Sequence, residues 1–177
     1  IVFSYAIVSL FVEIGSPVPR LAGARVVNLI ASALQAGSPD ASAPRARLAL
    51  GAIEAGYAVG ATGIALHHVL CQTIVGIGGV PHAPTYGVML PFTLEFYRVR
   101  DDLTWNLISE EMATTDPSMT IARSCAAAGN PTTLGALGVA PERVEAIIAA
   151  ATERPELART PGGASEHDVR SLIESAF

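Results

Sequence analysis

The stretch from Gly56 to Val75 constrains the fold of this chain more than any other part of the sequence. It contains no Asp, Glu, Lys or Arg, so it carries no charge unless a histidine is protonated. It is long enough to resemble a transmembrane helix. Four polar side chains nevertheless lie within it, namely His67, His68, Gln72 and Thr73. These polar groups favour the buried central helix of a globular protein over a membrane span.

The other apolar residues recur at helical spacing, and no useful length of strand-like alternation is present. Gly15–Pro17, Gly37–Asp40, the flexible loop Gly76–Pro81 and the loop Glu153–Gly163 separate the periodic segments, and Ser165 can cap the last helix. The sequence therefore predicts an all-α, multi-helix bundle that forms one helical domain over residues 1–177. Helices are expected at 1–14, 19–36, 45–75 (bent near Gly60 or Gly63), 82–98 (kinked at Pro91), 102–114, 117–128, 133–137, 141–151 and 166–176.

Composition excludes several classes of protein. Half of the residues are hydrophobic and 15% are charged, which rules out a disordered chain. The net charge is -5 and the arginines are scattered, so no basic stripe for nucleic acid is present. The apolar run Ile1–Val12 is too short to span a bilayer, and no basic segment precedes it as in a signal peptide. With only Cys71 and Cys125 as cysteines, we expect a reduced, cytoplasmic protein without membrane or nucleic-acid partners.

Three histidines, His67, His68 and His82, flank the glycine-rich loop at 76–79. Adjacent residues of a helix point about 100° apart, so His67 and His68 cannot both face one pocket squarely. One of them can meet His82 if the loop folds back. Imidazole titrates near neutrality, so such a pair can bind a metal or move protons. The alternative is that one of the adjacent histidines is a hydrogen-bonded core residue.

The same region resembles the signature of the maleylacetate reductases. That family has a Gly-x-x-x-His-His-x-Leu-Cys-His pattern, a Gly-Leu-Pro-His-Ala turn and a Leu-Pro-His helix. The matching segments here are Gly63–Gln72, Gly79–Ala83 and Leu90–Phe92, and the likeness continues through Asn130–Leu134 and Asp168–Leu172. The resemblance implies the C-terminal helical domain of the maleylacetate reductase and iron-containing alcohol dehydrogenase family, standing without its nucleotide-binding half.

The resemblance also implies where a metal would bind in metal-dependent members of the family. Two of their ligands match His68 and His82, and the other two, an Asp and a His, fall at Ile1 and Tyr5. Isoleucine cannot coordinate a cation, and a neutral tyrosine is a poor ligand for Fe²⁺ or Zn²⁺. Three protein ligands are the usual minimum for a catalytic metal. We therefore expect no bound metal.

Several positions of the implied pocket depart from the family. Gln72 stands where the family has a histidine, and Tyr86 and Phe92 stand where reductases often carry one. Pro84 replaces a common Glu, and Tyr97 replaces a common Asn. We expect Gln72, Tyr86, Phe92 and Tyr97 to contact a substrate that is more apolar than a dicarboxylate.

The glycines at 76–79 do not form a dinucleotide fingerprint, because no strand-helix-strand pattern surrounds them. The Gly-Gly-Gly-Ser phosphate loop that the resemblance implies for the nucleotide-binding domain is missing as well. We therefore expect no cofactor on this chain and no hydride transfer from it alone.

The favoured hypothesis is a stand-alone, cofactor-independent enzyme on a repurposed reductase domain. It would isomerise, dehydrate or cyclise an unsaturated carbonyl or polyene compound, with His68, His82, Tyr5 and His67 as its catalytic residues. One alternative is the helical half of an NAD(P)H-dependent reductase whose nucleotide domain is missing or on a partner chain. The other is a non-catalytic binding or oligomerisation domain. Each predicts association, and we expect a homodimer that pairs through the first helix.

Overall fold

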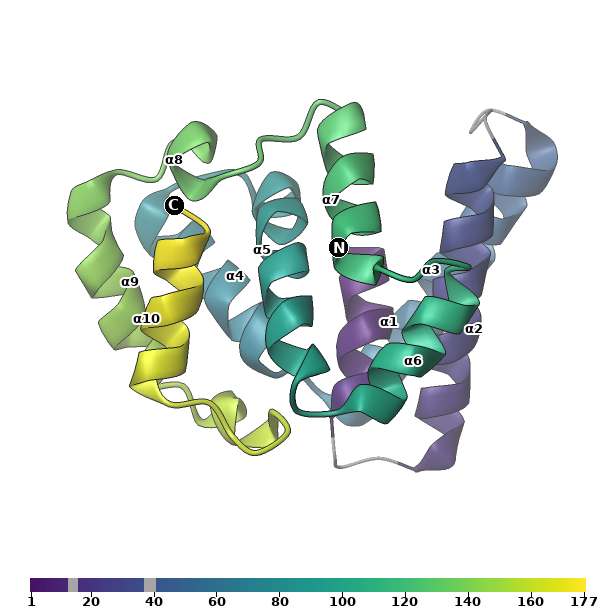
Figure 1. Cartoon of the computed structure of the whole chain (residues 1–177), viewed down its shortest axis with the longest axis horizontal. Coiled ribbons are helices and arrows are strands. Elements are labelled where there is room, and N and C mark those ends of the chain that lie inside the picture. The colour runs from purple at the N-terminus through teal and green to yellow at the C-terminus, as the bar shows by residue number, and fades with distance from the viewer. Residues whose placement is uncertain (13–15, 37–40) are drawn as a thin grey trace.

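The computed structural model describes residues 1–12, 16–36 and 41–177, and within them every regular element is helical. The sequence-based prediction of an all-α bundle is therefore confirmed. Figure 1 shows the arrangement, with α7 between two groups of helices. The elements are α1 Val2–Phe11, α2 Pro17–Gln35, α3 Ser42–Thr62, α4 Leu66–Gly78, α5 His82–Arg98, α6 Asp102–Glu111, α7 Pro117–Ala127, α8 Leu134–Leu137, η1 Pro141–Arg143, α9 Val144–Thr152, η2 Pro155–Arg159 and α10 Glu166–Ser175.

Helix α1 lies in the interior of the molecule. Seven of its ten residues are buried, and it contacts α2, α3, α5 and α6. Its composition explains this position, because a helix that is apolar on nearly every face has to be covered on most of them. The expectation that two copies pair through the first helix is therefore wrong, since its surface is already used inside one chain.

The long helix expected at 45–75 is in fact two helices. α3 ends at Thr62, α4 begins at Leu66, and their axes differ by 101°. Gly63 has φ +79°, a left-handed conformation that disfavours side chains, and a Cβ there would collide with the guanidinium of Arg159. No single helix in the described part of the chain is long and apolar enough to cross a membrane, although α3 and α4 together would have the length and composition.

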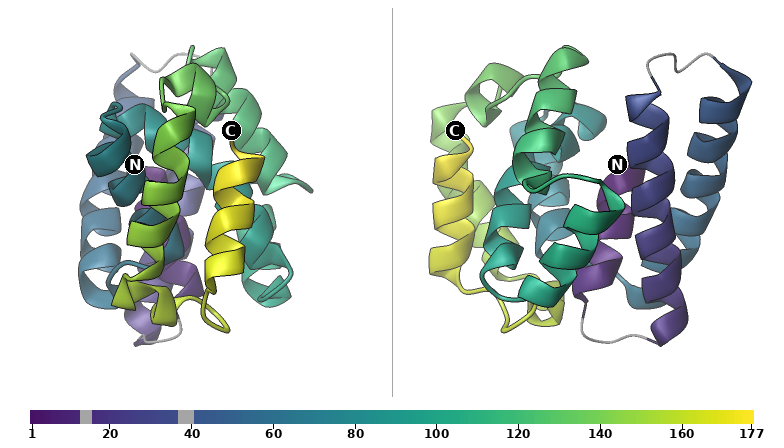
Figure 2. Two further views of the ribbon diagram at one scale, coloured as in Figure 1. Left: turned by 90° about the vertical axis from the view of Figure 1, so that its left-hand side faces the viewer. Right: turned by 45° about the vertical axis from the view of Figure 1, so that its right-hand side comes forward.

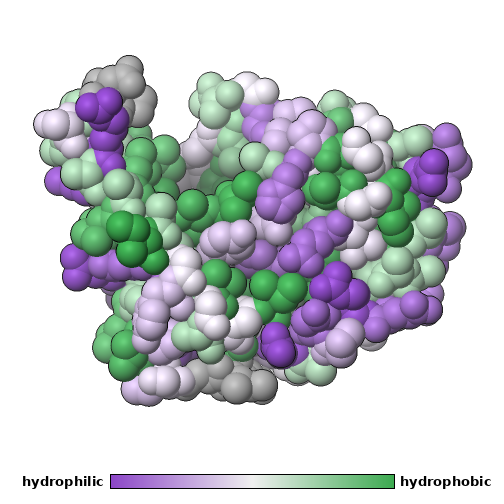
Figure 3. Space-filling model, turned by 180° about the vertical axis from the view of Figure 1, so that it is seen from behind, coloured by the Kyte–Doolittle hydropathy of each residue, from purple (hydrophilic) through white to green (hydrophobic). Residues whose placement is uncertain are grey.

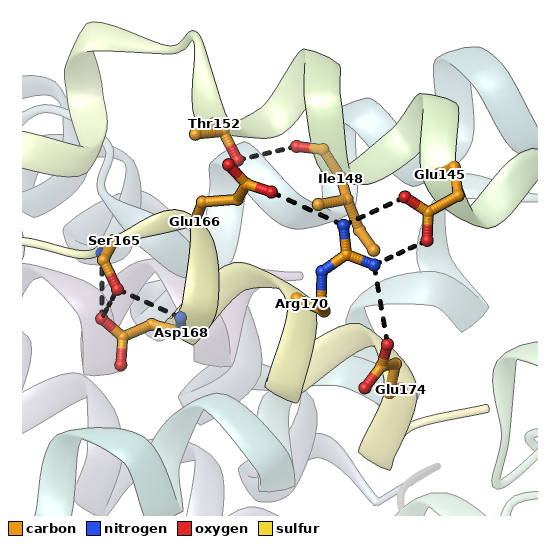
Figure 4. A network of polar contacts seen from close by, with 8 residues as sticks. All are labelled: Glu145, Ile148, Thr152, Ser165, Glu166, Asp168, Arg170 and Glu174. Carbon is orange, nitrogen blue, oxygen red and sulfur yellow. Dashed lines mark hydrogen bonds and ion pairs between the residues drawn. The ribbon is translucent and has the colours of Figure 1, made fainter.

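The C-terminal helices pack on the far side of the molecule from α2 and α3 (Figure 2). α9 contacts α4 and α10, and α10 also contacts α5. Ser165 and Asp168 form a capping box at the start of α10, as the sequence indicated. Arg170 joins α10 to α9 through two hydrogen bonds to the Glu145 carboxylate, of 2.6 and 3.0 Å (Figure 4).

Most expected helix ends agree with the observed ones to within a few residues, and α5 has the expected bounds. α5 continues through Pro91. Two segments differ: α4 extends to Gly78 into the expected loop, and η2 occupies part of the loop expected at 153–163. The expected end of the first helix at residues 13–15 and the turn at 37–40 lie outside the described residues. The assignment of the whole chain to one domain stays a prediction.

Candidate functional site

Five aromatic side chains from three helices form what we call the histidine–tyrosine cluster: Tyr5 of α1, His67 and His68 of α4, and His82 and Tyr86 of α5. Tyr86 is at its centre, with ring centroids 5.2 Å from His67, 5.5 Å from His68 and 4.5 Å from His82. The Tyr5 ring stacks on His68 at 5.0 Å. The loop between α4 and α5 therefore does fold back and bring His82 to the adjacent pair.

The turn that allows this geometry starts at Gly79. This residue caps the C-terminal end of α4 with φ 69° and ψ 25°, the left-handed conformation in which glycine has no steric penalty. Pro81 then precedes the first turn of α5, which begins at His82. His82 therefore begins α5, and helical geometry puts it one turn before Tyr86 on the same face.

His67 has the surroundings of a core histidine. Its side chain is fully buried, and its Nδ1 lies 2.9 Å from the hydroxyl oxygen of Thr93. That hydroxyl donates its hydrogen within α5 to the carbonyl oxygens of Met89 and Leu90, so its oxygen accepts a hydrogen bond from the N–H at His67 Nδ1. Burial, and then the neighbouring His68, hold the pKa of His67 well below its usual value. A catalytic role for His67 stays a prediction.

His68 differs from His67 in having no hydrogen bond. Its side chain is 1% exposed, and neither ring nitrogen has a hydrogen-bond partner among the described residues. A buried polar group without a partner costs about 1–3 kcal/mol. Burial lowers the pKa of His68 to about 4, so its ring is neutral at pH 7. A neutral imidazole offers one N–H donor and one acceptor, and in His68 both are buried and unused.

Three residues expected at the site lie outside the cluster. Gln72 is exposed and accepts a hydrogen bond of 3.3 Å from Arg154. Phe92 lines an open groove between α5, α7 and α10. Tyr97 is buried and stacks on Phe11 at 4.5 Å. Tyr97 returns to the face of α5 that carries Tyr86, but three turns later, about 16 Å along the axis.

A cavity of about 190 Å³, not anticipated from the sequence, adjoins the cluster. Tyr86 forms part of its wall, and α1, α2, α5 and α7 supply most of the rest. No sequence motif indicated this cavity, because its lining residues come from distant segments and share only their packing. They are Ile1, Phe3, Ile30, Ala31, Leu34, Gln35, Tyr86, Gly87, Leu90, Met112, Thr120, Ile121, Ser124 and Cys125.

The cluster does not fit the metal that the family resemblance implies. The four positions concerned hold Ile1, Tyr5, His68 and His82, and the isoleucine side chain has no donor atom. Among the residues that the structure describes, no three His, Cys, Asp or Glu side chains gather as a metal site would require. We therefore assign no chemical step to a metal, and the expected absence of one stays a prediction.

Comparison with known proteins places the chain within a family. Residues 12–177 match the model of the Fe-containing alcohol dehydrogenase family, C-terminal. The chain is 29% identical over 176 residues to maleylacetate reductase 1 of Rhodococcus opacus, covering 98% of this chain and 49% of that protein. It is also 29% identical over 177 residues to the maleylacetate reductase of Burkholderia cepacia, with the same coverage.

Solved structures agree with these matches. The maleylacetate reductase of Agrobacterium tumefaciens superposes with a TM-score of 0.85 at 26% identity, over 99% of this chain and 50% of that one. A 1,3-propanediol oxidoreductase superposes with a TM-score of 0.90 at 20% identity, with the same coverage, which shows the shared fold. The chain thus spans about half the length of the relatives it matches.

These relatives overturn the hypothesis of an isomerase, dehydratase or cyclase. The curated relatives named above are maleylacetate reductases, which supports the reductase alternative and not an isomerase or cyclase. The substitutions at Gln72, Tyr86 and Phe92 suggested new chemistry, but only Tyr86 lies in the histidine–tyrosine cluster. The match extends over nearly all of the helical bundle, and so confirms the resemblance noted in the sequence: the chain belongs to the Fe-containing alcohol dehydrogenase family, as its C-terminal region.

Proposed function

We propose that this chain forms the helical half of an NAD(P)H-dependent oxidoreductase of the maleylacetate-reductase type. The observation that carries the proposal is His68, a buried histidine with two unpaired nitrogens inside the histidine–tyrosine cluster. It belongs to the segment Gly63–Gln72 in which the chain resembles the maleylacetate reductases. Relatives of that name match almost the entire chain.

The cluster suits the reduction of a carbonyl compound, which needs a hydrogen-bond donor at the substrate oxygen. His68 is neutral at pH 7, and its ring retains one N–H that can donate a hydrogen bond to that oxygen. Burial raises the pKa of Tyr86, so its phenol also remains protonated and able to donate. His82 is exposed, and its ring can therefore pass a proton between water and the cluster.

The nucleotide site has to come from outside these 177 residues. The described residues form helices only, and the sequence lacks the phosphate loop that a dinucleotide requires. NAD(P)H would supply the hydride from a nucleotide-binding half, which could be another part of a longer protein or a partner chain. The absence of a cofactor from this chain itself stays a prediction.

A fusion protein tests the proposed function. The nucleotide-binding half of the Rhodococcus opacus maleylacetate reductase would be joined in front of Ile1, and NADH oxidation would be followed with maleylacetate, cyclohexanone and hexanal. We expect reduction of at least one carbonyl compound by the fusion and none by the 177-residue chain alone. A fusion that folds and binds NADH but reduces no carbonyl compound would contradict the proposal.

We also propose that the chain forms a homodimer through α3 and not through α1. Leu50, Ile53 and Tyr57 lie on one side of α3 and are 37%, 73% and 52% exposed. Exposed apolar patches of this kind commonly mark an interface. Sedimentation velocity of the unmodified chain and of Ile53→Glu tests this, with a dimer expected only for the unmodified chain. Monomers from both at micromolar concentration would contradict it.

A further inference from the structure

We propose that the 190 Å³ cavity behind Tyr86 binds the hydrocarbon part of the substrate, and that it selects an uncharged carbonyl compound with a ring or short branched chain over a dicarboxylate. The inference rests on the proposed function, because it names the substrate class of that site. It is argued from the shape, charge and surroundings of the cavity.

The cavity is partly open to the molecular surface. Viewed from behind, the surface is indented next to the end of the α2–α3 pair, and hydrophobic residues border the indentation (Figure 3). Ile30, Ala31 and Leu34 of α2 form one wall of the cavity, and Ile121 and Cys125 of α7 form part of the opposite wall. The space therefore lies between two helices that approach each other from distant parts of the chain.

The side chains that line the cavity carry no charge. Ile1 also borders it, and burial lowers the pKa of its α-amino group, so this group is largely neutral at pH 8.5 to 9. None of the fourteen described residues that border it has a charged side chain, and the polar groups among them are an amide, hydroxyls and a thiol. Moving a carboxylate from water into such surroundings without a cationic partner is strongly unfavourable. A dicarboxylate would therefore have to leave the cavity empty, whereas a hydrocarbon group would gain from filling it.

The size of the cavity limits the group that it can accept. An apolar cavity of about 150 Å³ is large enough for benzene in an engineered protein. The present cavity, of about 190 Å³, therefore has room for a six-membered ring with one small substituent, or a branched chain of similar size. Longer chains or fused rings would have to project through its open side.

Tyr86 connects the cavity to the histidine–tyrosine cluster. Its ring borders the cavity, and the same ring is within 5.5 Å of His67, His68 and His82. α1 makes a second connection, because Phe3 lines the cavity while Tyr5 stacks on His68. A substrate with its hydrocarbon part in the cavity can therefore direct its carbonyl oxygen to Tyr86, whose ring lies 5.5 Å from that of His68, although His68 itself does not border the cavity.

Cys125 provides a direct readout of occupancy. It is half-buried on the cavity wall, whereas the other cysteine, Cys71, is fully buried in α4. Iodoacetamide alkylation of the 177-residue chain would be followed residue by residue with mass spectrometry. Burial raises the pKa of Cys125, so labelling is run at pH 8.5 to 9 to increase the thiolate fraction.

The probes are cyclohexanone and maleate. For a ligand of this size we expect a dissociation constant on the order of 1 mM, so ten times that concentration should slow alkylation of Cys125 about tenfold. Cyclohexanone should give this protection, and maleate at the same concentration should give none. Equal or greater protection by maleate, or no protection by cyclohexanone at saturating concentration, would overturn the inference.

Two matched variants check that protection arises in the cavity. Ala31→Phe places a large side chain in the cavity wall and should abolish protection by cyclohexanone, whereas Ala122→Phe, which faces the open groove on the other side of α7, should keep it. If Ala31→Phe does not fold, the comparison of the two probes on the unmodified chain still decides. Protection that survives in folded Ala31→Phe would count against the cavity.

The labelling experiment is independent of reduction, so the two proposals can fail separately. A fusion protein that reduces maleylacetate while the chain gives no protection by cyclohexanone would leave the proposed function standing and overturn this inference. Protection by cyclohexanone together with an inactive fusion would support a binding site for uncharged rings and contradict the oxidoreductase.

Discussion

The α5–α7 helix pair separates two hollows that differ in almost every physical property. On one side is the cavity of about 190 Å³, whose lining has no charged side chain. On the other, towards α10, is an open groove of about 670 Å³ lined in part by Glu95, Asp116, His167 and Asp168. Volume alone would select the groove. His68, whose ring nitrogens are unpaired, is connected to the smaller cavity through Tyr86, whereas the groove is bordered by Ser118, whose buried hydroxyl is also unpaired among the described residues. The two hollows therefore differ in the charge of their side chains, and this difference, more than their volume, indicates which of them suits an uncharged ligand.

The largest expected effect is the loss of activity when His68 is replaced, compared with the replacement of His167 at the groove. In the fusion protein, His68→Ala should lower kcat/KM for carbonyl reduction by about 10²–10⁴-fold, because a positioned donor at the substrate oxygen is lost. His167→Ala, on the groove side, is the matched control and should leave kcat/KM unchanged. Steady-state kinetics of NADH oxidation measure both. Equal losses of kcat/KM in the two variants would contradict the assignment of this donor to His68.

A second expected effect concerns the two alanines that face the two hollows. In the fusion protein, Ala31→Phe should reduce kcat/KM for cyclohexanone about tenfold or more, since the ring would have to give up its apolar site. Ala122→Phe should have little effect on the same substrate. The contrast is measured as the ratio of kcat/KM values for cyclohexanone and acetone, because acetone is small enough to need less of the cavity. A ratio that changes equally in both variants would place the substrate elsewhere.

A third prediction concerns stability against pH. The pKa of His68 is about 4 in the folded chain, whereas an unfolded histidine titrates near 6.5. Between these values the unfolded state binds more protons, so the free energy of unfolding should fall as the pH decreases from about 6.5 to 4. His68 should contribute on the order of 1–3 kcal/mol to this loss. Urea denaturation at pH 7.5 and 4.5 measures it, and His68→Gln should show a smaller difference. His167→Gln should keep the full difference, and the idea fails if the two variants behave alike.

The smallest expected effect lies beyond the groove, where α10 is joined to α9. Arg170 pairs there with Glu145, with Glu166 at 3.5 Å and Glu174 at 3.7 Å (Figure 4). These partners are mostly exposed, so Arg170→Met should lower the free energy of unfolding only slightly. Denaturation at low and high salt measures it. The loss should shrink at high salt, and a loss of several kcal/mol at either concentration would contradict this view of the α9–α10 contact.

The parts of the fold that the sequence predicted well are those set by local signals. The bounds of α5 and the capping box at Ser165 follow from residues that are adjacent in the chain. The break at Gly63 was anticipated only as a bend, and the sequence did not indicate that Arg159 of η2 lies next to this glycine. A contact between residues so far apart in the chain leaves no local pattern.

The candidate site shows the same limit. Helical geometry indicated that His67 and His68 must differ, and the structure assigns the difference to Thr93, which bonds His67 and leaves His68 unpaired. Phe92 and Tyr97 were expected at the site because they replace polar residues of the family, yet their positions along α5 direct them elsewhere. Homodimer formation and a cytoplasmic location stay predictions.

One NMR experiment can show whether an uncharged ring compound binds near His68 or in the groove near His167. Imidazole ¹⁵N chemical shifts of the four histidines would be followed by NMR while cyclohexanone is added to the 177-residue chain at pH 7. Our account predicts that the ring nitrogens of His68 shift as one of them gains a hydrogen bond, whereas His167 remains unchanged. A shift of His167 with an unaltered His68 would contradict it.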